Sequence, residues 1–230
     1  MFPESALVTG GRSGIGAAIV AQFEAEGTDV EVLDLADGFD VSDPAAWKDV
    51  GPVDLACLNA GVTTGTADVL DLTDEQYRRA VGVNVDGVVY GVRHLARVMK
   101  PGSAIVATAS LAGLVAVDDE PIYALTKHAV VGFVRSVAAQ LAERGIRINM
   151  VNPGFADTPM VDGQLRERLE AGGFPLLRAD DVATAVLHAA RSDETGQAWV
   201  VQPGREPIKF RFPNVPGPRG PSGETIGAPL

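Results

Sequence analysis

The sequence predicts an α/β protein with one Rossmann-like domain, in which about seven parallel strands form a doubly wound sheet flanked by helices. Three observations lead to this fold class. Short runs rich in valine, isoleucine and leucine alternate with helix-length segments. The runs are apolar throughout, which is typical of parallel strands covered on both faces. A glycine-rich turn joins the first run to the first helical segment, and such alternation implies right-handed crossovers.

Six apolar runs are predicted as strands. They span residues 6–8, 30–34, 53–58, 104–108, 146–151 and 198–201. In an open parallel sheet, ligands bind beyond the carboxyl ends of the strands, near the point where the strand order reverses. The chemical motifs described below follow the ends of these runs, so we expect them to gather at one edge of the sheet.

Four segments are predicted as helices. They span residues 15–26, 73–99, 121–144 and 180–191. Gly27 and Gly145 end the first and the third of these segments. Thr73 with Gln76 three residues later forms a capping box for the second. Pro121 suits the first turn of the third.

The chain divides into a dinucleotide-binding catalytic domain, residues 1–204, and a C-terminal tail, residues 205–230. The stretch 203–230 contains seven prolines and five glycines, a composition that continues neither a helix nor a central strand. Two readings stay open. The tail is loose, or it docks on its own body or on another subunit, with Phe210 and Phe212 as aromatic anchors.

Composition excludes several classes of protein. The 230-residue chain has a formal net charge of −11, which opposes binding to nucleic acid and to anionic membranes. We see no signal peptide and no run near the roughly 20 apolar residues of a membrane span. The single cysteine, Cys57, lies in an apolar run, where we expect a buried and unreactive thiol. We therefore expect a cytoplasmic protein, and no metal in its site.

A glycine-rich turn follows the first predicted strand and reads Thr9-Gly10-Gly11-Arg12-Ser13-Gly14-Ile15-Gly16. Gly10 allows the tight turn, Gly14 lets the backbone approach a pyrophosphate, and Gly16 lets the helix pack closely on the sheet. The helix that begins here offers free N–H groups and a positive dipole end to phosphates. The cofactor contacts predicted in this turn are Gly10, Arg12, Ser13, Gly14, Ile15 and Gly16.

The end of the second predicted strand bears on the choice of cofactor. Asp34 lies 18 residues after Gly16, where a carboxylate suits the adenosine ribose hydroxyls and repels a 2′-phosphate. Neither Leu35 nor Ser13 offers a cation, so we favour NAD over NADP. Arg12 is the counterargument, since it could reach a phosphate. Two further residues are candidates for adenine contacts, Asp40 and Val41, although acidic loop residues are commonly just solvated.

Three polar residues suggest proton transfer. Tyr123 and Lys127 are four residues apart in a predicted helix, so they share one face of it. A neighbouring ammonium lowers the pKa of a phenol, which is otherwise a poor base at neutral pH. Ser110 follows a predicted strand and can hydrogen-bond a substrate oxygen. The alternative is that Tyr123 and Lys127 are an ordinary pair on a helix surface. The presence of Ser110 and the glycine turn favours the catalytic interpretation over this one.

These motifs resemble those of the classical short-chain dehydrogenases/reductases (the SDR family), over about residues 6–204. The matching segments are the glycine turn, Asn59-Ala60-Gly61, Asn84 between two valines, Ser110 with Tyr123 and Lys127, and Pro153-Gly154 followed by Thr158. The resemblance implies that the nicotinamide supplies the hydride chemistry while the protein positions it. It also implies a homotetramer or a homodimer.

Roles for single residues follow from the same resemblance. Tyr123 would be the general acid/base, Lys127 would lower its pKa and bind the nicotinamide ribose, and Ser110 would orient the substrate. Asn84 would hold a water that links Lys127 to solvent. The further cofactor contacts that the resemblance implies are Asn59, Ala60, Gly61, Tyr123, Lys127, Pro153, Gly154 and Thr158. A structural role for Asn84, and a simple turn at Pro153-Gly154, stay open as alternatives.

Some features depart from the family pattern. The last predicted strand is not followed by the family's pair of glycines, a proline-rich tail extends the chain, and the segment 156–178, which covers the substrate in the family, is rather short. The apolar stretch 111–117 either lines the substrate pocket or packs in the core. Acidic residues at 118–120 either repel anionic substrates or favour the dipole of the next helix.

The sequence as a whole predicts an NAD-dependent oxidoreductase that transfers hydride between nicotinamide and a secondary alcohol or ketone, without a phosphate or coenzyme A handle on the substrate. One alternative is an NADP-dependent carbonyl reductase. Another, from a different class, is a non-catalytic dinucleotide sensor or scaffold.

Overall fold

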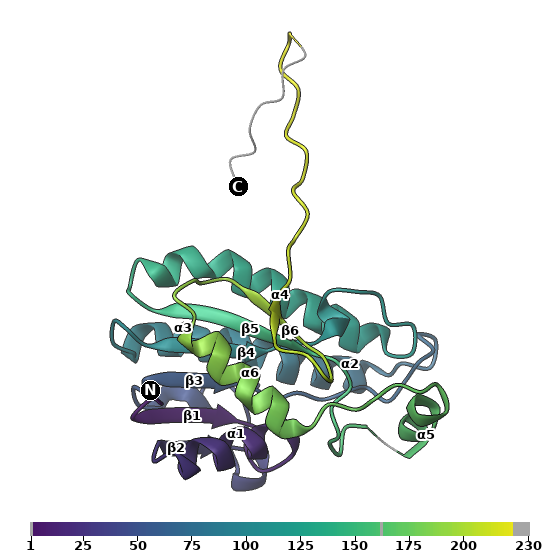
Figure 1. The fold of residues 1–230 in the computed structure, drawn as a ribbon, viewed down its shortest axis with the longest axis horizontal. Helices are drawn as coiled ribbons and strands as arrows, with labels where there is room; N and C mark the ends of the chain where they lie inside the picture. The colour runs from purple at the N-terminus through teal and green to yellow at the C-terminus, as the bar shows by residue number, and fades with distance from the viewer. Residues whose placement is uncertain (1, 162, 223–230) are drawn as a thin grey trace.

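The computed structural model describes residues 2–161 and 163–222, and it contains the predicted doubly wound sheet (Figure 1). Seven strands lie in the order β2-β1-β3-β4-β5-β6-β7, and all pairs are parallel except the last. Their bounds are β1 Ser5–Thr9, β2 Asp29–Leu33, β3 Leu55–Leu58, β4 Ala104–Thr108, β5 Arg147–Pro153, β6 Ala198–Val201 and β7 Ile208–Lys209. The fold class predicted from the sequence is confirmed.

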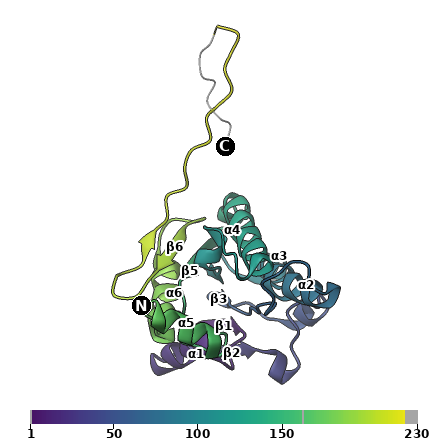
Figure 2. The same cartoon turned by 90° about the vertical axis from the view of Figure 1, so that its right-hand side faces the viewer.

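Helices cover both faces of the sheet, as Figure 2 shows. On one face α1 (Gly14–Ala25) and α6 (Ala179–Arg191) bury Ile19, Phe23 and the inner side chains of α6 against β1, β3 and β4. On the other face α3 (Gly87–Val98) and α4 (Pro121–Ala142) pack on the opposite side chains of the same strands. Burial on both faces explains why the strands read as continuous apolar runs.

The strand order reverses beside β1, which lies between β2 and β3. The glycine turn follows the carboxyl end of β1, and Asn59 follows the carboxyl end of β3. These two ends are neighbours because Val8 of β1 is in register with Cys57 of β3. The topology therefore places both motifs at the point where parallel sheets of this kind bind ligands.

The predicted single helix over residues 73–99 is wrong. The structure divides it into α2 (Asp74–Val81), a π-helical turn at Gly82–Asp86, and α3. The capping box of Thr73 and Gln76 is present at the start of α2. A π turn inserts extra backbone into the helix without changing its apolar pattern, so the sequence gives little sign of it. The insertion turns Asn84 into the interior, where it is fully buried.

The seventh strand comes from the tail. β7 pairs antiparallel with β6 at the edge of the sheet, and Phe210 N–H then donates to Ala198 O at 2.8 Å. The rings of Phe210 and Phe212 meet edge to face and pack against the core. A two-residue edge strand agrees with a composition that excludes a central one. Of the two readings of the tail, its first part, through Phe212, therefore docks on its own body.

Short elements connect the main ones. Two 3-10 turns, η1 (Leu35–Asp37) and η2 (Ala46–Asp49), follow β2, and a third, η4 (Leu111–Gly113), follows β4. One further helix, α5 (Gly163–Ala171), was not predicted from the sequence. Cys57 is 1% exposed and burial raises its pKa, as expected for an inert thiol. Among the described residues no helix is long and apolar enough to cross a bilayer.

Candidate active site

The glycine turn at the start of α1 needs glycine at three positions. Gly10 and Gly14 have positive φ angles of 65° and 51°, which favour glycine. A Cβ at Gly16 would lie 2.0 Å from the Gly10 carbonyl oxygen, so only glycine fits there. Ser13 makes no side-chain cap at the helix N-terminus, and the first turn holds no acidic residue. These features fit a bound pyrophosphate.

Thr9 joins the glycine turn to the Asn59-Ala60-Gly61 turn, a role that the sequence did not reveal. Its hydroxyl oxygen accepts from Asn59 N–H at 2.8 Å and from Ala60 N–H at 3.0 Å. The Asn59 amide donates to Thr9 O at 3.2 Å and accepts from the Thr108 hydroxyl at 3.1 Å. Asn59 thus connects the carboxyl ends of β1, β3 and β4 and holds the wall beside the glycine turn.

Asp34 lies at the end of β2, where the sequence placed the ribose contact. Its carboxylate accepts from Arg12 N–H at 3.0 Å and from Ala36 N–H at 2.9 Å. The Arg12 side chain turns to Asp37, with Nε 2.7 Å from the carboxylate. The guanidinium that could meet a 2′-phosphate is therefore paired with a carboxylate of η1.

Three other predicted cofactor residues follow Asp34. Leu35 is exposed. The Asp40 carboxylate accepts from the backbone N–H and the hydroxyl of Ser42, so it forms a local turn. Val41 is buried in the core, and its carbonyl accepts from Trp47 Nε1 at 3.1 Å. The buried Val41 side chain is therefore not available to contact adenine.

Tyr123 and Ser110 meet beyond the carboxyl end of β4. Tyr123 lies in the first turn of α4, and Ser110 is the N-cap of η4. Burial raises the pKa of Tyr123 to about 12, a hydrogen bond with Ser110 opposes this rise, and the charge of Glu120 adds to it. Ser110 Oγ also accepts from Ala112 N–H at 3.1 Å, which holds the side-chain oxygen in position.

Lys127 lies one turn after Tyr123 and is 3% exposed. Its ammonium donates to Thr108 O at 2.8 Å and lies 5.4 Å from the centre of the Tyr123 ring. Burial lowers the pKa of Lys127 to about 8. A Cβ at Gly61 would lie 3.4 Å from this ammonium. The predicted pair therefore shares one site with the Asn-Ala-Gly turn.

Asn84 joins the same cluster through its side chain. Its amide oxygen accepts from Val62 N–H at 2.8 Å, and its amide nitrogen donates to Val62 O at 2.8 Å and to Thr126 Oγ1 at 3.0 Å. The side chain thus ties the loop after Gly61 to α4. Thr126 was not singled out from the sequence. The water that Asn84 was expected to hold stays a prediction.

The segment after β5 lies over the glycine turn. A Cβ at Gly14 would meet Thr158 at 3.2 Å, so this threonine sits directly against the turn. Pro153 O lies 3.5 Å from the Ser110 hydroxyl, and Gly154 N–H donates to Val201 O at 3.0 Å. Pro153, the last residue of β5, therefore lies beside Ser110, and Thr158 lies against the glycine turn, while Gly154 bonds to the end of β6.

Glu120 is a polar residue of the site whose contacts the sequence did not reveal. Its carboxylate accepts from the Thr64 hydroxyl at 2.8 Å, from Thr64 N–H at 3.3 Å and from Gly65 N–H at 2.8 Å. It precedes α4 by one residue. The contact joins two loops far apart in the chain, so no local pattern could have predicted it.

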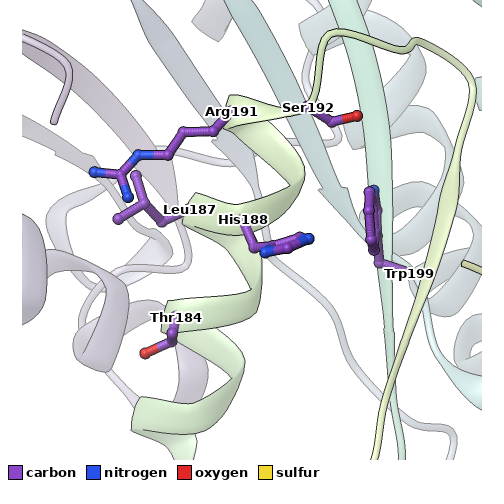
Figure 3. Close-up of a pocket in the computed structure, with 6 residues that line it drawn as sticks. All are labelled: Thr184, Leu187, His188, Arg191, Ser192 and Trp199. Carbon is purple, nitrogen blue, oxygen red and sulfur yellow. The ribbon is translucent and has the colours of Figure 1, made fainter. Parts of the chain in front are cut away.

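A separate hollow of about 290 Å³ lies between α6 and β6 (Figure 3). Its lining residues are Thr184, Leu187, His188, Arg191, Ser192 and Trp199. The His188 ring lies edge-on to Trp199, with centroids 4.5 Å apart. Nothing in this lining belongs to the cluster around Tyr123, so the hollow is not the candidate active site.

Comparison with known proteins agrees with this geometry. The family model described as enoyl-(acyl carrier protein) reductase matches residues 42–204. The chain is 34% identical to momilactone A synthase of Oryza sativa subsp. japonica, over 90% of this chain and 91% of the relative. It is 34% identical to (+)-borneol dehydrogenase 1 of Salvia officinalis, over 82% and 86%. The chain therefore belongs to the classical short-chain dehydrogenase/reductase family.

A solved structure also matches. A short-chain dehydrogenase from Burkholderia cenocepacia J2315, in complex with NADP, has a TM-score of 0.77 and 29% sequence identity, over 86% of this chain and 96% of that chain. The family membership establishes an oxidoreductase of the NAD(P)-binding type with a Rossmann fold.

Proposed function

We propose that the protein is an NAD-dependent dehydrogenase of apolar secondary alcohols, which also reduces the corresponding ketones. The observation that carries the proposal is the gathering of Ser110, Tyr123 and Lys127 beyond the carboxyl end of β4, next to the glycine turn.

Each of the three residues has a defined part. Tyr123 takes the hydroxyl proton of the alcohol, or returns it to the ketone oxygen. Lys127 stabilises the phenolate and so lowers the barrier to this transfer. Ser110 donates a hydrogen bond to the same substrate oxygen, as its contact with Tyr123 favours. Bound nicotinamide supplies the hydride acceptor or donor.

The cofactor preference rests on the end of β2. The Asp34 carboxylate repels a 2′-phosphate. The Arg12 guanidinium, which could attract that phosphate, is paired with Asp37. These contacts favour NAD. The similar structure from Burkholderia cenocepacia holds NADP, which supports the rival carbonyl reductase. Side-by-side fluorescence titration with NADH and NADPH decides between them, and tighter binding of NADPH would overturn our choice.

The substrate class rests on the side chains near Ser110. Exposed apolar residues stand on the loops that follow β4 and β5, namely Val115, Phe155, Met160 and Phe174. Asp118 and Asp119 are exposed just before α4, and their negative charges disfavour a phosphate group on the substrate. The relative from Salvia officinalis is named for borneol, an apolar secondary alcohol.

A second substrate class has support from one comparison. The matching family model is described as an enoyl-(acyl carrier protein) reductase. A panel of cyclic secondary alcohols against acyl-carrier and coenzyme A thioesters separates the two classes. Turnover of the thioesters alone would overturn the alcohol proposal.

The decisive test of catalysis is Tyr123→Phe. We expect kcat to fall by about a thousandfold or more, while the Kd for NADH stays within about threefold. Tyr77→Phe, at an exposed position of α2, is the matched control. Equal activity of wild type and Tyr123→Phe would favour the non-catalytic sensor or scaffold.

Two further expectations belong to this proposal. We propose that the protein assembles as a homodimer or homotetramer and works in the cytoplasm on a small-molecule alcohol or ketone. The acidic net charge of −11 disfavours nucleic acid and anionic membranes as partners. Sedimentation at several concentrations measures the assembly, and a monomer at all of them would contradict it.

A further inference from the structure

The first residue after β6 is Gln202, and here the chain departs from the family pattern. It reads Val201-Gln202-Pro203-Gly204 and lacks the pair of glycines that the family places after its last strand. Proline biases the residue before it toward an extended backbone. The alternation of side chains along β6 is therefore expected to continue through Gln202.

This alternation places the side chain of Gln202 on the face of the sheet that α4 covers. Side chains alternate along a strand, so Ala198, Val200 and Gln202 share one face. Ala198 packs in the core cluster that contains the inner side chains of α4, whereas Trp199 belongs to the cluster on the α6 face. Gln202 and the helix that carries Tyr123 are therefore on the same side of the sheet.

The amide group of Gln202 lies directly against Gly154. A Cβ at Gly154 would be 2.9 Å from the Gln202 amide oxygen and 3.6 Å from the amide carbon. The same point would be 3.6 Å from Leu111 Cδ1. Leu111 follows Ser110, and the Pro153 carbonyl oxygen lies 3.5 Å from the Ser110 hydroxyl. The Gln202 amide is therefore next to the residues that surround Ser110.

The amide of Gln202 is available to a ligand. Its oxygen faces Gly154, and its nitrogen lies farther from that residue than the oxygen does. Neither atom of the amide has a hydrogen-bond partner within residues 2–161 and 163–222, and the residue is partly buried. An amide that loses water without gaining a partner costs free energy. The position therefore favours a substrate that offers the amide an oxygen atom.

Apolar side chains accompany this amide. Leu111 approaches the same point at Gly154, and Phe155, the next residue, is exposed. A few polar groups in a mostly apolar site fix the orientation of a ligand. A site built to hydrogen-bond a substrate oxygen also rejects the analogue that lacks it, because the polar group of the protein is then left unpaired. A neutral amide suits an uncharged oxygen.

We propose that Gln202 determines substrate specificity, and that its amide hydrogen-bonds a second, uncharged oxygen of the substrate. This oxygen belongs to a hydroxyl or a carbonyl group on a carbon other than the reacting one. The inference rests on the proposed function, in which Ser110 binds the oxygen on the reacting carbon. The substrate is then an apolar secondary alcohol or ketone with a further oxygen on its skeleton.

The first test measures kcat/KM for cyclohexanol and for the three positional isomers of cyclohexanediol, which vary the distance between the two oxygens. We expect the wild type to favour at least one diol over cyclohexanol by about tenfold, as one hydrogen bond to an otherwise unpaired amide provides. In Gln202→Leu, which has no hydrogen-bonding group, this ratio should fall to within about twofold of one. Gln140→Leu, at an exposed position near the end of α4, is the matched control and should keep the wild-type ratio.

Two results of this test would overturn the proposal. One is a wild type that favours no diol, and the other is a preference that Gln202→Leu retains. In both cases the alcohols are still oxidised, so the proposed function stands. Absence of turnover of every alcohol with either cofactor would instead contradict the proposed function, and this inference with it.

The second test measures binding without turnover. With Tyr123→Phe and bound NADH, fluorescence quenching gives the Kd of the hydroxycyclohexanone and of the cyclohexanedione that match the favoured diol. Adding Gln202→Glu keeps an acceptor and removes the donor. It should therefore weaken binding of the dione about tenfold more than binding of the hydroxyketone. Equal effects on the two ketones, or a loss of NADH affinity of the same size, would contradict the proposal.

Discussion

The Glu120 carboxylate accepts a hydrogen bond from the Thr64 hydroxyl at 2.8 Å, between two loops that are 56 residues apart in the chain. Glu120 is also three residues before Tyr123. One carboxylate therefore holds the loop after the Asn-Ala-Gly turn and places a negative charge beside the proposed acid/base. Its charge adds to the burial that raises the pKa of Tyr123.

Glu120→Gln is expected to have two effects. Alcohol oxidation needs Tyr123 deprotonated, so removing the neighbouring charge moves the rising limb of the pH profile to lower pH. The amide group also brings two N–H donors toward the donors of Thr64 and Gly65, which weakens the contact. We expect kcat/KM at the optimum to fall by about tenfold.

The measurement is the pH dependence of kcat/KM for wild type and variant. Asp118→Asn removes the same charge from an exposed position two residues earlier and serves as the control. A pH profile of Glu120→Gln that coincides with that of Asp118→Asn would contradict this role.

Local sequence features predicted the centre of the site. Tyr123 and Lys127 share a helix face because they are four residues apart, and Ser110 joins them because it follows a neighbouring strand. The glycine turn needs little beyond its own backbone. These residues are set by spacing and by strand order, which a sequence reveals directly.

Other features depend on contacts that spacing does not reveal. The π turn at Gly82–Asp86 leaves the apolar pattern of residues 73–99 unchanged, so one continuous helix was the natural expectation. Thr9 and Thr126 act through bonds to Asn59 and Asn84, which are distant in the chain. β7 forms only because the tail folds back on β6.

The buried ammonium of Lys127 makes stability depend on pH. Its pKa is about 8 in the folded chain, against 10.5 for an unperturbed lysine. Between these values the unfolded chain binds more protons, so the free energy of unfolding rises with pH. The rise is about 1.4 kcal/mol per pH unit, or about 2 kcal/mol between about pH 8 and 9.5. Tyr123, whose pKa is raised, reverses the trend above about pH 10.

Lys127→Met removes this titration. Urea unfolding at about pH 7.5 and 9.5 should give a wild-type stability that rises relative to the variant by about 2 kcal/mol. Lys100→Met, at an exposed position, should change nothing in this range. A constant difference between wild type and Lys127→Met at both pH values would mean that Lys127 titrates normally.

The pair of Arg12 and Asp37 should influence the choice of cofactor. Asp37→Asn removes the carboxylate that now holds the guanidinium at 2.7 Å, which leaves Arg12 free to meet a 2′-phosphate. We expect NADPH to bind about fivefold more tightly, in keeping with the strength of an exposed ion pair, and NADH to bind as before. Asp49→Asn, another exposed acid, is the control in the same fluorescence titration. Unchanged NADPH binding would show that Arg12 does not reach the phosphate.

One exposed ion pair connects α5 to the loop before the catalytic helix. Arg168 Nη1 lies 2.8 Å from the Asp119 carboxylate, which is two residues before α4. Surface ion pairs contribute at most about 1 kcal/mol to stability. Arg168→Gln should therefore leave the unfolding free energy nearly unchanged.

The same variant should act on substrate binding, because Thr158, which precedes α5 in the chain, lies against the glycine turn. We expect Arg168→Gln to raise KM about threefold at low salt with kcat retained, and the difference to vanish at about 1 M salt. Arg78→Gln breaks the exposed pair of Arg78 and Asp74 on α2 and should leave KM unchanged. If Arg168→Gln and Arg78→Gln give the same KM at low salt, the contact with Asp119 does not influence substrate binding.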